Sequence, residues 1–288
     1  MRGALRTVQR RAAIAPPLKW AGGKRWLLAH LERLWEPEAH RRLVEPFMGG
    51  LAVALGLGPE HALLNDANPH VVNFYRQLRD GLKISLKMSN DEETYYALRN
   101  RFNALAREGQ AFTADGAQLF YYLNRTGFNG LCRFNKRGEF NVPMGRYATI
   151  DYEDSASLKR YSGVLDGWEF ADADFEHLDL ESNDFVYADP PYDDAFTGYN
   201  RGGFAWADQE RLATWLADHD GPVVASNHAT DRIKGLYRHL GFAIHQLDAP
   251  RRISCTGDRT AVAEMLATRN LGCKTSPGLC TRCGLTVV

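Results

Sequence analysis

The four residues Asp189-Pro190-Pro191-Tyr192 combine side chains that can bind and activate an aromatic amine. Such an amine is a poor nucleophile because its lone pair is delocalised into the ring, so it needs acceptors that hold both N–H groups. The Asp189 carboxylate offers one acceptor, and the carbonyl of Pro190 offers another. Two prolines stiffen the turn and remove competing N–H donors, and Tyr192 offers a flat face for stacking. A tight turn at the end of a buried strand is the alternative interpretation.

The residues before this turn predict the strand that must carry it, because Phe185–Ala188 is a short apolar run that leads directly into Asp189. Other segments show the same arrangement of an apolar run followed by polar groups. Alternating strands and helices with polar residues at the strand ends are typical of an α/β fold with a doubly wound, Rossmann-like sheet, which binds ligands at that edge. The further predicted strands are those in Arg42–Leu57 (strand, Gly-rich turn and helix start), Ala62–Leu64 (before Asn65-Asp66) and Pro222–Ala225 (before Ser226-Asn227-His228).

Residues 81–155 differ from this pattern, and we predict that they form a mostly helical insertion. Tyr95, Leu98, Phe102 and Leu105 have helical spacing. The stretch Asn124–Tyr147 that follows is rich in Gly, Asn, Arg and aromatic residues, which indicates a hairpin or loop that is presented outward.

The charges of the 288-residue chain are segregated although the net charge is zero. Residues 1–31 carry seven basic side chains and no acid, residues 121–147 are also basic, and residues 148–194 contain fourteen acids. Separate cationic patches can follow a polyanion, while ordinary solvated faces are the alternative. No apolar run approaches the roughly 20 residues of a membrane helix and no secretory signal is evident. We therefore expect a cytoplasmic protein.

Five cysteines are too few for a disulfide framework, which suits a reducing compartment. Cys273, Cys280 and Cys283 lie near the C-terminus, but a structural zinc site takes four ligands and no fourth Cys or His is close by. Cys255 or a distant His could complete such a site. Free thiols in a loose tail are the favoured interpretation, and we predict no metal.

Five landmarks, in this order, resemble the Dam-type DNA adenine-N6 methyltransferases. The likeness extends from about Pro17 to about Asn270, with cofactor, recognition and catalytic motifs in the α-type order. The resemblance implies transfer of a methyl group from S-adenosylmethionine to N6 of a flipped adenine in double-stranded DNA, with Asp189, Pro190 and Tyr192 as catalytic residues. No obligate protein partner is evident from the sequence. The landmarks are Leu18–Lys24, Glu45–Gly50, Leu64–Asn68, Tyr122–Tyr147 and Asp189–Tyr192.

The resemblance also predicts the domain organisation. Residues 1–16 are expected to be a flexible basic N-terminus, and residues 17–80 with 156–270 the catalytic domain. Residues 81–155 then form the target-recognition domain, and residues 271–288 a cysteine-containing tail.

The implied cofactor contacts agree with the chemistry of the residues. Lys24 follows two glycines and can meet a carboxylate of the cofactor, although a helix cap is the alternative. Asp66 at a strand end can accept hydrogen bonds from ribose hydroxyls, although an Asx turn is the alternative. Leu51 departs from the usual F-x-G-x-G pattern, and a one-residue shift to Gly50 is the expected compensation. The predicted cofactor-binding residues are Trp20, Lys24, Phe47, Gly49, Asp66 and Asp189.

The segment Tyr122–Tyr147 is the predicted recognition element. Arginine reads guanine through O6 and N7, and aromatics among Asn and Gly suit a hairpin that wedges between bases. The resemblance implies GATC as the target, with Lys19 at the first guanine, and Phe128 entering the helix. Arg125 is expected at a phosphate, with a solvated surface position as the alternative. The predicted DNA-binding residues are Lys19, Arg125, Phe128, Asn129, Leu131, Arg133, Asn135, Pro143 and Tyr147.

Two other functions remain open from the sequence. Methyltransferases of glutamine side chains or RNA bases resemble the same sheet, but they usually begin the catalytic tetrapeptide with Asn and lack the basic hairpin. A DNA-binding protein with a failed cofactor pocket is favoured by Leu51 alone. Retention of Lys24, Asp66 and Asp189 speaks against it.

Overall fold

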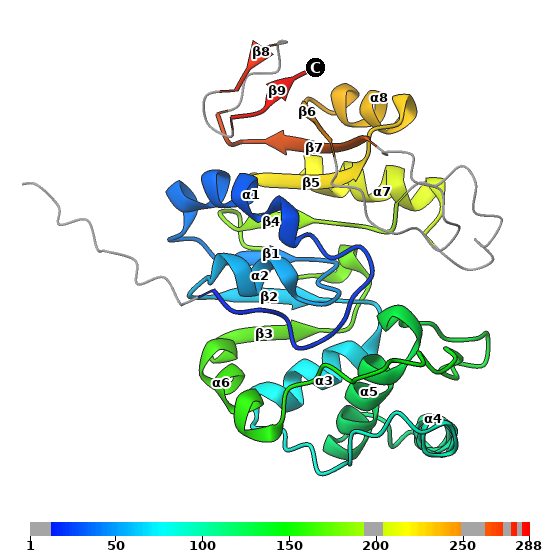
Figure 1. The fold of residues 1–288 in the computed structure, drawn as a ribbon. Helices are drawn as coiled ribbons and strands as arrows, with labels where there is room; N and C mark the ends of the chain where they lie inside the picture. Colours follow the sequence, from blue (N-terminus) through cyan, green and yellow to red (C-terminus); the bar gives the residue numbers. More distant parts are fainter. Residues whose placement is uncertain (1–12, 193–203, 249–262, 273–277, 281–283) are drawn as a thin grey trace, which may run out of the picture.

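The strands of the sheet are added outward in two directions from its centre: β2 and β3 lie on one side of β1, and β4 and β5 lie on the other (Figure 1). The computed structural model describes residues 13–192, 204–248, 263–272, 278–280 and 284–288, and within them the sheet has nine strands in the order β3-β2-β1-β4-β5-β7-β6-β9-β8. β1, β2, β3, β4 and β5 run parallel, and β7 pairs antiparallel with β5. The strands are β1 (Leu43–Glu45), β2 (Ala62–Asn65), β3 (Trp168–Ala171), β4 (Phe185–Ala188), β5 (Val223–His228), β6 (Ala243–Asp248), β7 (Ala263–Arg269), β8 (Gly278–Leu279) and β9 (Thr286–Val287).

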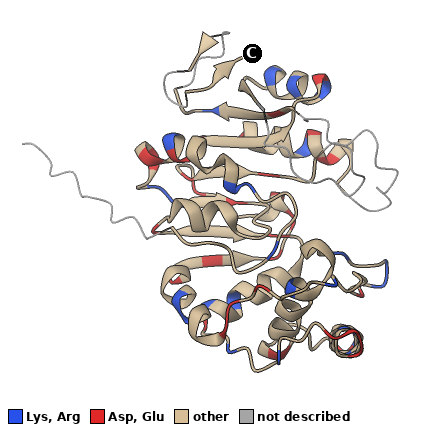
Figure 2. Ribbon diagram, viewed as in Figure 1, with Lys and Arg blue, Asp and Glu red and all other residues tan. Residues whose placement is uncertain are grey.

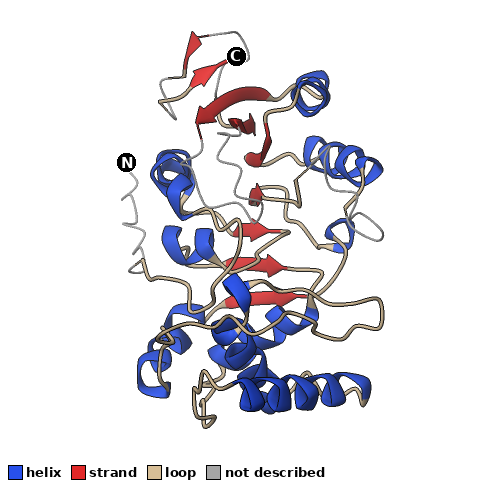
Figure 3. Cartoon of the chain, turned by 45° about the vertical axis from the view of Figure 1, so that its right-hand side comes forward, coloured by secondary structure: helices blue, strands red, loops and turns tan. Residues whose placement is uncertain are grey.

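Helices cover both faces of the sheet, as the edge-on view in Figure 3 shows. Strand β4 explains why two layers are needed, because successive side chains of a strand point to opposite faces. Phe185 and Tyr187 pack in the core that includes α1 and α2, whereas Val186 and Ala188 pack in the core of α7 and α8. The helices are α1 (Leu28–Trp35), α2 (Ala52–Leu57), α3 (Pro69–Arg79), α4 (Glu92–Arg107), α5 (Ala114–Thr126), α6 (Ser155–Leu165), α7 (Trp206–Ala217) and α8 (Asp231–His239), with 3-10 turns at Arg25–Leu27, Glu36–Glu38, Phe128–Gly130 and Phe175–His177.

The doubly wound α/β fold predicted from the sequence is confirmed. β4 has the predicted bounds, and β2 is one residue longer than expected. β5 continues to His228, so Ser226, Asn227 and His228 belong to the strand and do not follow it. Strand β3 was not expected, because it is short and lies in the acid-rich segment.

The helical section predicted after residue 81 contains α4 and α5, which lie beyond the β3 edge in Figure 1. The Asp91 side chain caps α4 by accepting from the Thr94 N–H, and Thr113 caps α5 in the same way. One apolar core joins both helices to the sheet, as Phe102 and Phe120 pack in the same cluster as Leu64. The domain boundaries at residues 81 and 155 stay predictions, and most of the expected basic N-terminus lies outside the described residues.

The hairpin predicted in residues 124–147 is present. Phe134 and Phe140 form an antiparallel bridge, and the Asn135 side chain accepts hydrogen bonds from the N–H groups of Arg137 and Glu139 to close the turn. In Figure 2 the ribbon of this loop is blue at its Lys and Arg residues.

The C-terminal segment is not the loose tail that we expected, as far as it is described. Strand β9 pairs with β6 through Val287 and His245, and β8 pairs with β9. Cys280 is buried there. Cys273 and Cys283 lie outside the described residues.

An ion pair between the residues that immediately precede β1 and β4 helps to align these two neighbouring strands. Arg42 precedes β1 and donates from Nε and Nη2 to the Asp184 carboxylate before β4, at 3.0 and 2.7 Å. Asp184 is fully buried, and the Arg42 side chain is 15% exposed. Leu43 is in register with Phe185, so this contact precedes the two strands whose far ends carry Glu45 and Asp189.

We predict that Arg42→Met lowers the free energy of unfolding by about 3–5 kcal/mol, because it leaves a buried carboxylate without its partner. Denaturant unfolding monitored by circular dichroism measures this change. Arg101→Met is the matched control, since Arg101 pairs with Asp115 at the surface and such pairs contribute roughly 0–1 kcal/mol. An equally small effect of both substitutions would contradict the role given to Arg42.

Candidate active site

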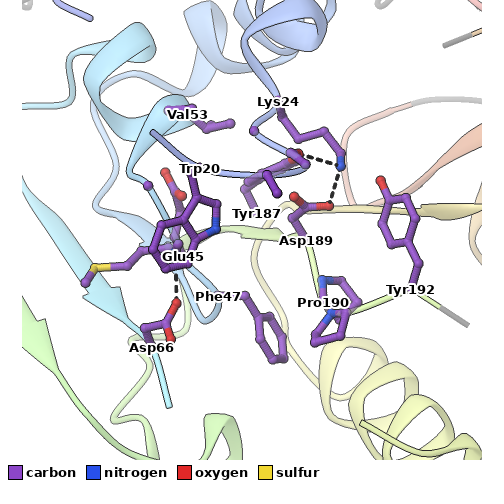
Figure 4. Close-up of a pocket in the computed structure, with 18 of the residues that line it drawn as sticks. Trp20, Lys24, Glu45, Phe47, Val53, Asp66, Tyr187, Asp189, Pro190 and Tyr192 are labelled. Carbon is purple, nitrogen blue, oxygen red and sulfur yellow. Dashed lines mark hydrogen bonds and ion pairs between the residues drawn. The ribbon is translucent and has the colours of Figure 1, made fainter. Parts of the chain in front are cut away.

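A cavity of about 530 Å³ lies at the carboxyl ends of β1 and β4, where the winding of the sheet reverses. Open α/β sheets bind their ligands at this topological switch point. The structure brings all six predicted cofactor residues into the wall of this one cavity, and it places the predicted catalytic residues there too (Figure 4). These wall residues are Trp20, Lys24, Phe47, Gly49, Asp66, Asp189, Pro190 and Tyr192.

The glycines after β1 allow Trp20 to lie directly on the turn. A Cβ atom on Gly49 would lie 2.6 Å from Trp20 Nε1, and one on Gly50 would lie 2.5 Å from Trp20 Cβ. Any larger side chain at either position would displace the indole ring from the cavity wall.

Leu51 itself adopts the left-handed conformation, with φ of 61°. The left-handed backbone therefore lies at Leu51 and not at Gly50, whereas Gly50 is a position where a Cβ would meet Trp20. A left-handed non-glycine residue costs about 1–2 kcal/mol, but the Leu51 side chain is fully buried, and such burial contributes about 1.5–3 kcal/mol. The turn is thus retained without the second spaced glycine.

Asp66 fixes the loop after β2. Its Oδ2 accepts from the Gly49 N–H at 2.9 Å, and its Oδ1 accepts from the Asn68 N–H at 2.8 Å. The second bond is the Asx turn considered from the sequence, and the same side chain also lines the cavity. Burial raises the pKa of Asp66, which the two N–H donors partly offset.

Asp189 follows β4 and is held through Oδ1. Ser226 Oγ donates to this oxygen at 2.8 Å, and Lys24 Nζ lies 3.2 Å from it. Burial raises the pKa of Asp189, while the Lys24 charge is the largest influence that lowers it. Figure 4 shows Lys24 and Asp189 pointing toward one another, so the lysine expected to meet a cofactor carboxylate already has a protein carboxylate as its partner.

Two acids of the site were not assigned from the sequence. Glu45 ends β1, lines the cavity and is 2% exposed, yet its Oε1 has no hydrogen-bond partner. Burial raises the pKa of Glu45 well above its usual range. Glu264 on β7 accepts from the Tyr192 hydroxyl at 2.9 Å. The signal for Glu264 was an acid immediately before the apolar run Met265-Leu266-Ala267, which we did not interpret as a strand.

Lys19 lies next to the cavity residue Trp20 and contacts the base of the hairpin. The Lys19 N–H donates to Asn124 Oδ1 at 2.8 Å, and its ammonium group lies 3.8 Å from the centre of the Tyr147 ring. Burial is the largest cause that lowers the pKa of Lys19, followed by the Arg125 charge. A Cβ on Gly130 would lie 2.3 Å from Lys19 Cβ, so the hairpin base and Lys19 are in close contact.

The other predicted DNA-binding residues fall into two groups. Exposed or half-exposed side chains are available at the hairpin and its base: Phe128, Asn129, Leu131, Arg133, Pro143 and Tyr147. Arg133 Nε is oriented by Asn141 Oδ1 at 2.8 Å. Asn135 has a structural task, because its side chain closes the hairpin turn.

The expected phosphate contact of Arg125 is not supported by its position. The residue is 7% exposed, and its guanidinium donates to the Asp151 carbonyl, the Asp151 carboxylate and the Pro17 carbonyl. These bonds fasten the segment before Lys19 to the loop after the hairpin. Arg125 is therefore a structural residue.

The described part of the chain offers neither a metal site nor a membrane-spanning helix. The side chains there include no group of three or more His, Cys, Asp or Glu that could hold a metal ion. None of the described helices is long and apolar enough to cross a membrane.

The sheet order and the cavity define a Rossmann-like methyltransferase domain, and comparison with known proteins identifies the family. The profile of the D12 class N6 adenine-specific DNA methyltransferases matches residues 20–253. The chain therefore belongs to this family, as the motifs predicted, which makes DNA its substrate class and implies a methyl donor such as S-adenosylmethionine.

Three proteins that are named as DNA adenine methylases or type II methyltransferases are similar to this chain over most of its length. The retron Ec67 DNA adenine methylase of Escherichia coli is 34% identical over 269 residues, covering 89% of this chain and 92% of that protein. The DNA adenine methylase of Vibrio cholerae serotype O1 is 36% identical over 272 residues, covering 87% and 94%. The type II methyltransferase M1.LlaDCHI of Lactococcus lactis subsp. cremoris is 33% identical over 274 residues, covering 88% and 95%.

We predict that Glu45→Gln stabilises the cofactor-free protein and weakens its binding of S-adenosylmethionine. A carboxyl whose folded pKa is raised destabilises the fold as pH rises above its unfolded pKa of about 4.3, so removing the charge should add roughly 0.5–2 kcal/mol at neutral pH. Glu45 can ionise to pair with the cofactor's ammonium group and Gln cannot, so the substitution should weaken binding about tenfold or more.

Thermal unfolding of the cofactor-free protein and calorimetric titration with S-adenosylmethionine measure the two effects. Glu60→Gln, at an exposed position, should leave both unchanged. Unaltered cofactor affinity in Glu45→Gln would remove Glu45 from the binding site.

Proposed function

We propose that this protein transfers a methyl group from S-adenosylmethionine to N6 of an adenine flipped out of double-stranded DNA, with GATC as its target. The observation that carries the proposal is the single cavity at the switch point. In its wall the Asp189-Pro190-Pro191-Tyr192 turn lies together with Asp66 and the glycine turn after β1.

The donors and acceptors of the cavity suit S-adenosylmethionine. Its volume, about 530 Å³, lies within the roughly 300–1,000 Å³ typical of small-molecule sites. Asp66 would hold the ribose hydroxyls, and the unpartnered Oε1 of buried Glu45 would accept from the ammonium group. Trp20 and Phe47 would supply apolar walls. When bound, this cofactor supplies an electrophilic methyl group on a sulfonium sulfur.

Asp189 and the Pro190 carbonyl would accept the two N–H groups of the adenine amine, which favours a nitrogen lone pair directed at the methyl group. The nitrogen becomes positively charged as it is methylated, and the buried carboxylate stabilises that charge. Asp189 must be ionised for both tasks. Lys24 and Ser226 favour its ionised form against the effect of burial, and positioning with electrostatics then suffices for the reaction.

The recognition proposal depends on the hairpin. Arg133 lies on its exposed arm with Nε held by Asn141, which leaves other guanidinium N–H groups for a guanine edge. Phe128 is 42% exposed at the hairpin base and would fill the space left by the flipped adenine. GATC itself is supported by the resemblance at Lys19, Leu131, Arg133, Pro143 and Tyr147.

A degenerate DNA-binding protein is the less favoured function. Its argument was Leu51, but the turn keeps its left-handed residue and the cavity behind it is formed.

Single-nucleotide mapping of methylated adenine tests the proposal directly. DNA from a methylation-free host that expresses the protein should carry N6-methyladenine confined to GATC, and expression of Asp189→Ala should leave the DNA unmodified. Methylation at another motif would keep the chemistry and discard the recognition assignment. Absence of both methylation and cofactor binding would overturn the enzyme itself.

We further predict that Arg133→Ala relaxes sequence choice. Loss of a bidentate guanine contact costs about 1–3 kcal/mol of discrimination, so the preference for the cognate site over a site with one guanine replaced should fall roughly 10- to 100-fold. Competition between the two duplexes in one reaction measures the ratio. Arg137→Ala, on the exposed tip of the same hairpin, should slow both duplexes alike. Equal slowing of both duplexes by Arg133→Ala would make Arg133 a phosphate contact.

A further inference from the structure

Glu264 brings a second carboxylate to the lysine that faces Asp189. Lys24 Nζ lies 3.2 Å from Asp189 Oδ1 and 4.0 Å from Glu264 Oε2. The lysine is 5% exposed and the Glu264 side chain is 12% exposed, so water screens these charges little.

The sheet topology explains how an acid of β7 reaches the cavity edge. β7 runs antiparallel to β5, with Glu264 in register with His228 at the carboxyl end of β5. The start of β7 therefore meets the edge where the parallel strands end. There the Tyr192 hydroxyl donates to Glu264 Oε2 at 2.9 Å, and the His228 ring packs against the Tyr192 ring at 4.4 Å between centroids.

A purely structural role does not require this charge. A neutral amide at position 264 could accept the same Tyr192 hydrogen bond, whereas burial makes the carboxylate costly and raises its pKa. The balance of charges suggests what the carboxylate adds. With Asp189 alone, Lys24 would neutralise the acceptor that the adenine amine needs, and would compete for the same oxygen. With Glu264, one lysine is shared by two carboxylates, which leaves one net negative charge for the developing cation on N6.

We propose that Glu264 is a positioning residue that draws Lys24 away from Asp189 when the amine binds, so that Asp189 keeps its charge for the reacting nitrogen. This inference rests on the proposed function. Glu264 also fixes the Tyr192 hydroxyl, but its distinguishing contribution is the charge held near Lys24.

Steady-state kinetics of Glu264→Gln test the proposal, with the recognition duplex found by mapping as the substrate. The amide keeps an acceptor for Tyr192 and loses the charge, so kcat should fall on the order of 10- to 100-fold while KM for DNA and for S-adenosylmethionine stays near the wild-type values. Glu264→Asp keeps the charge and should recover part of the lost kcat. Glu169→Gln, an exposed acid of β3, is the control for the same chemical change and should match wild type.

Two further readouts separate positioning from simple damage. Fluorescence of a duplex with 2-aminopurine at the target adenine should stay at the wild-type level in Glu264→Gln, because base capture does not depend on the charge. The acidic limb of the kcat profile should move to lower pH, since Lys24 then favours ionised Asp189 more strongly. The ionisable groups around this pair are Lys24, Glu45, Tyr187, Asp189, Tyr192, His228 and Glu264.

Wild-type kcat in Glu264→Gln, or a lower kcat in Glu264→Asp than in Glu264→Gln, would overturn the inference. So would loss of the 2-aminopurine signal in Glu264→Gln, which would make Glu264 a support of base capture. A wild-type protein without methylation activity would instead show failure of the proposed function.

Discussion

Lys24 and Asp189 lie 3.2 Å apart, yet they come from segments far apart in the sequence. Asp189 ends the central strand β4, whereas Lys24 comes from the segment before α1, outside the sheet. The carboxyls of Glu45, Asp66 and Asp189 converge on this edge, with Glu45 buried and the other two partly exposed. Loss of water contact raises the pKa of each. Burial thus disfavours the ionised form of these carboxyls, and a ligand that carries positive charge would favour it. The same carboxyls would therefore lower the stability of the cofactor-free protein and raise its affinity for a cationic cofactor.

Close packing of backbone and indole ring is the second constraint on this cavity. Trp20 occupies the volume that side chains at positions 49 and 50 would need. Leu51 accepts a left-handed backbone so that the turn can continue into α2, and burial of its side chain offsets that strain. The departure from the usual glycine pattern thus changes how the turn is stabilised, while its shape is kept.

The sequence was most informative where function is local. Asp189 follows an apolar run directly, and the strand-to-turn pattern predicted its place because the relevant contacts lie within a few residues. Glu264 could not be found in this way, since its role arises from antiparallel pairing of β7 with β5 across some 36 residues. The expectation for Arg125 failed for a related reason: its charge suggested a phosphate, but the side chain is 7% exposed and pairs with Asp151, 26 residues away in the chain. Helix and strand patterns in the sequence were therefore enough to place the predicted catalytic turn. Which charged side chains face the cavity depends on contacts between residues that are far apart in the chain.

The cofactor edge and the recognition hairpin share one short segment. Asn68 follows Asp66 in the loop after β2, caps α3 by accepting from the His70 N–H, and donates from Nδ2 to Cys132 Sγ in the hairpin. His70, in the first turn of α3, stacks on Phe134 of the same hairpin with ring centroids 4.9 Å apart. Burial lowers the pKa of His70 to about 4, so the stacked ring is neutral at physiological pH. The same residues thus hold the loop after β2 and seat the hairpin, so packing within one apolar core fixes the spacing between the cavity edge and the hairpin.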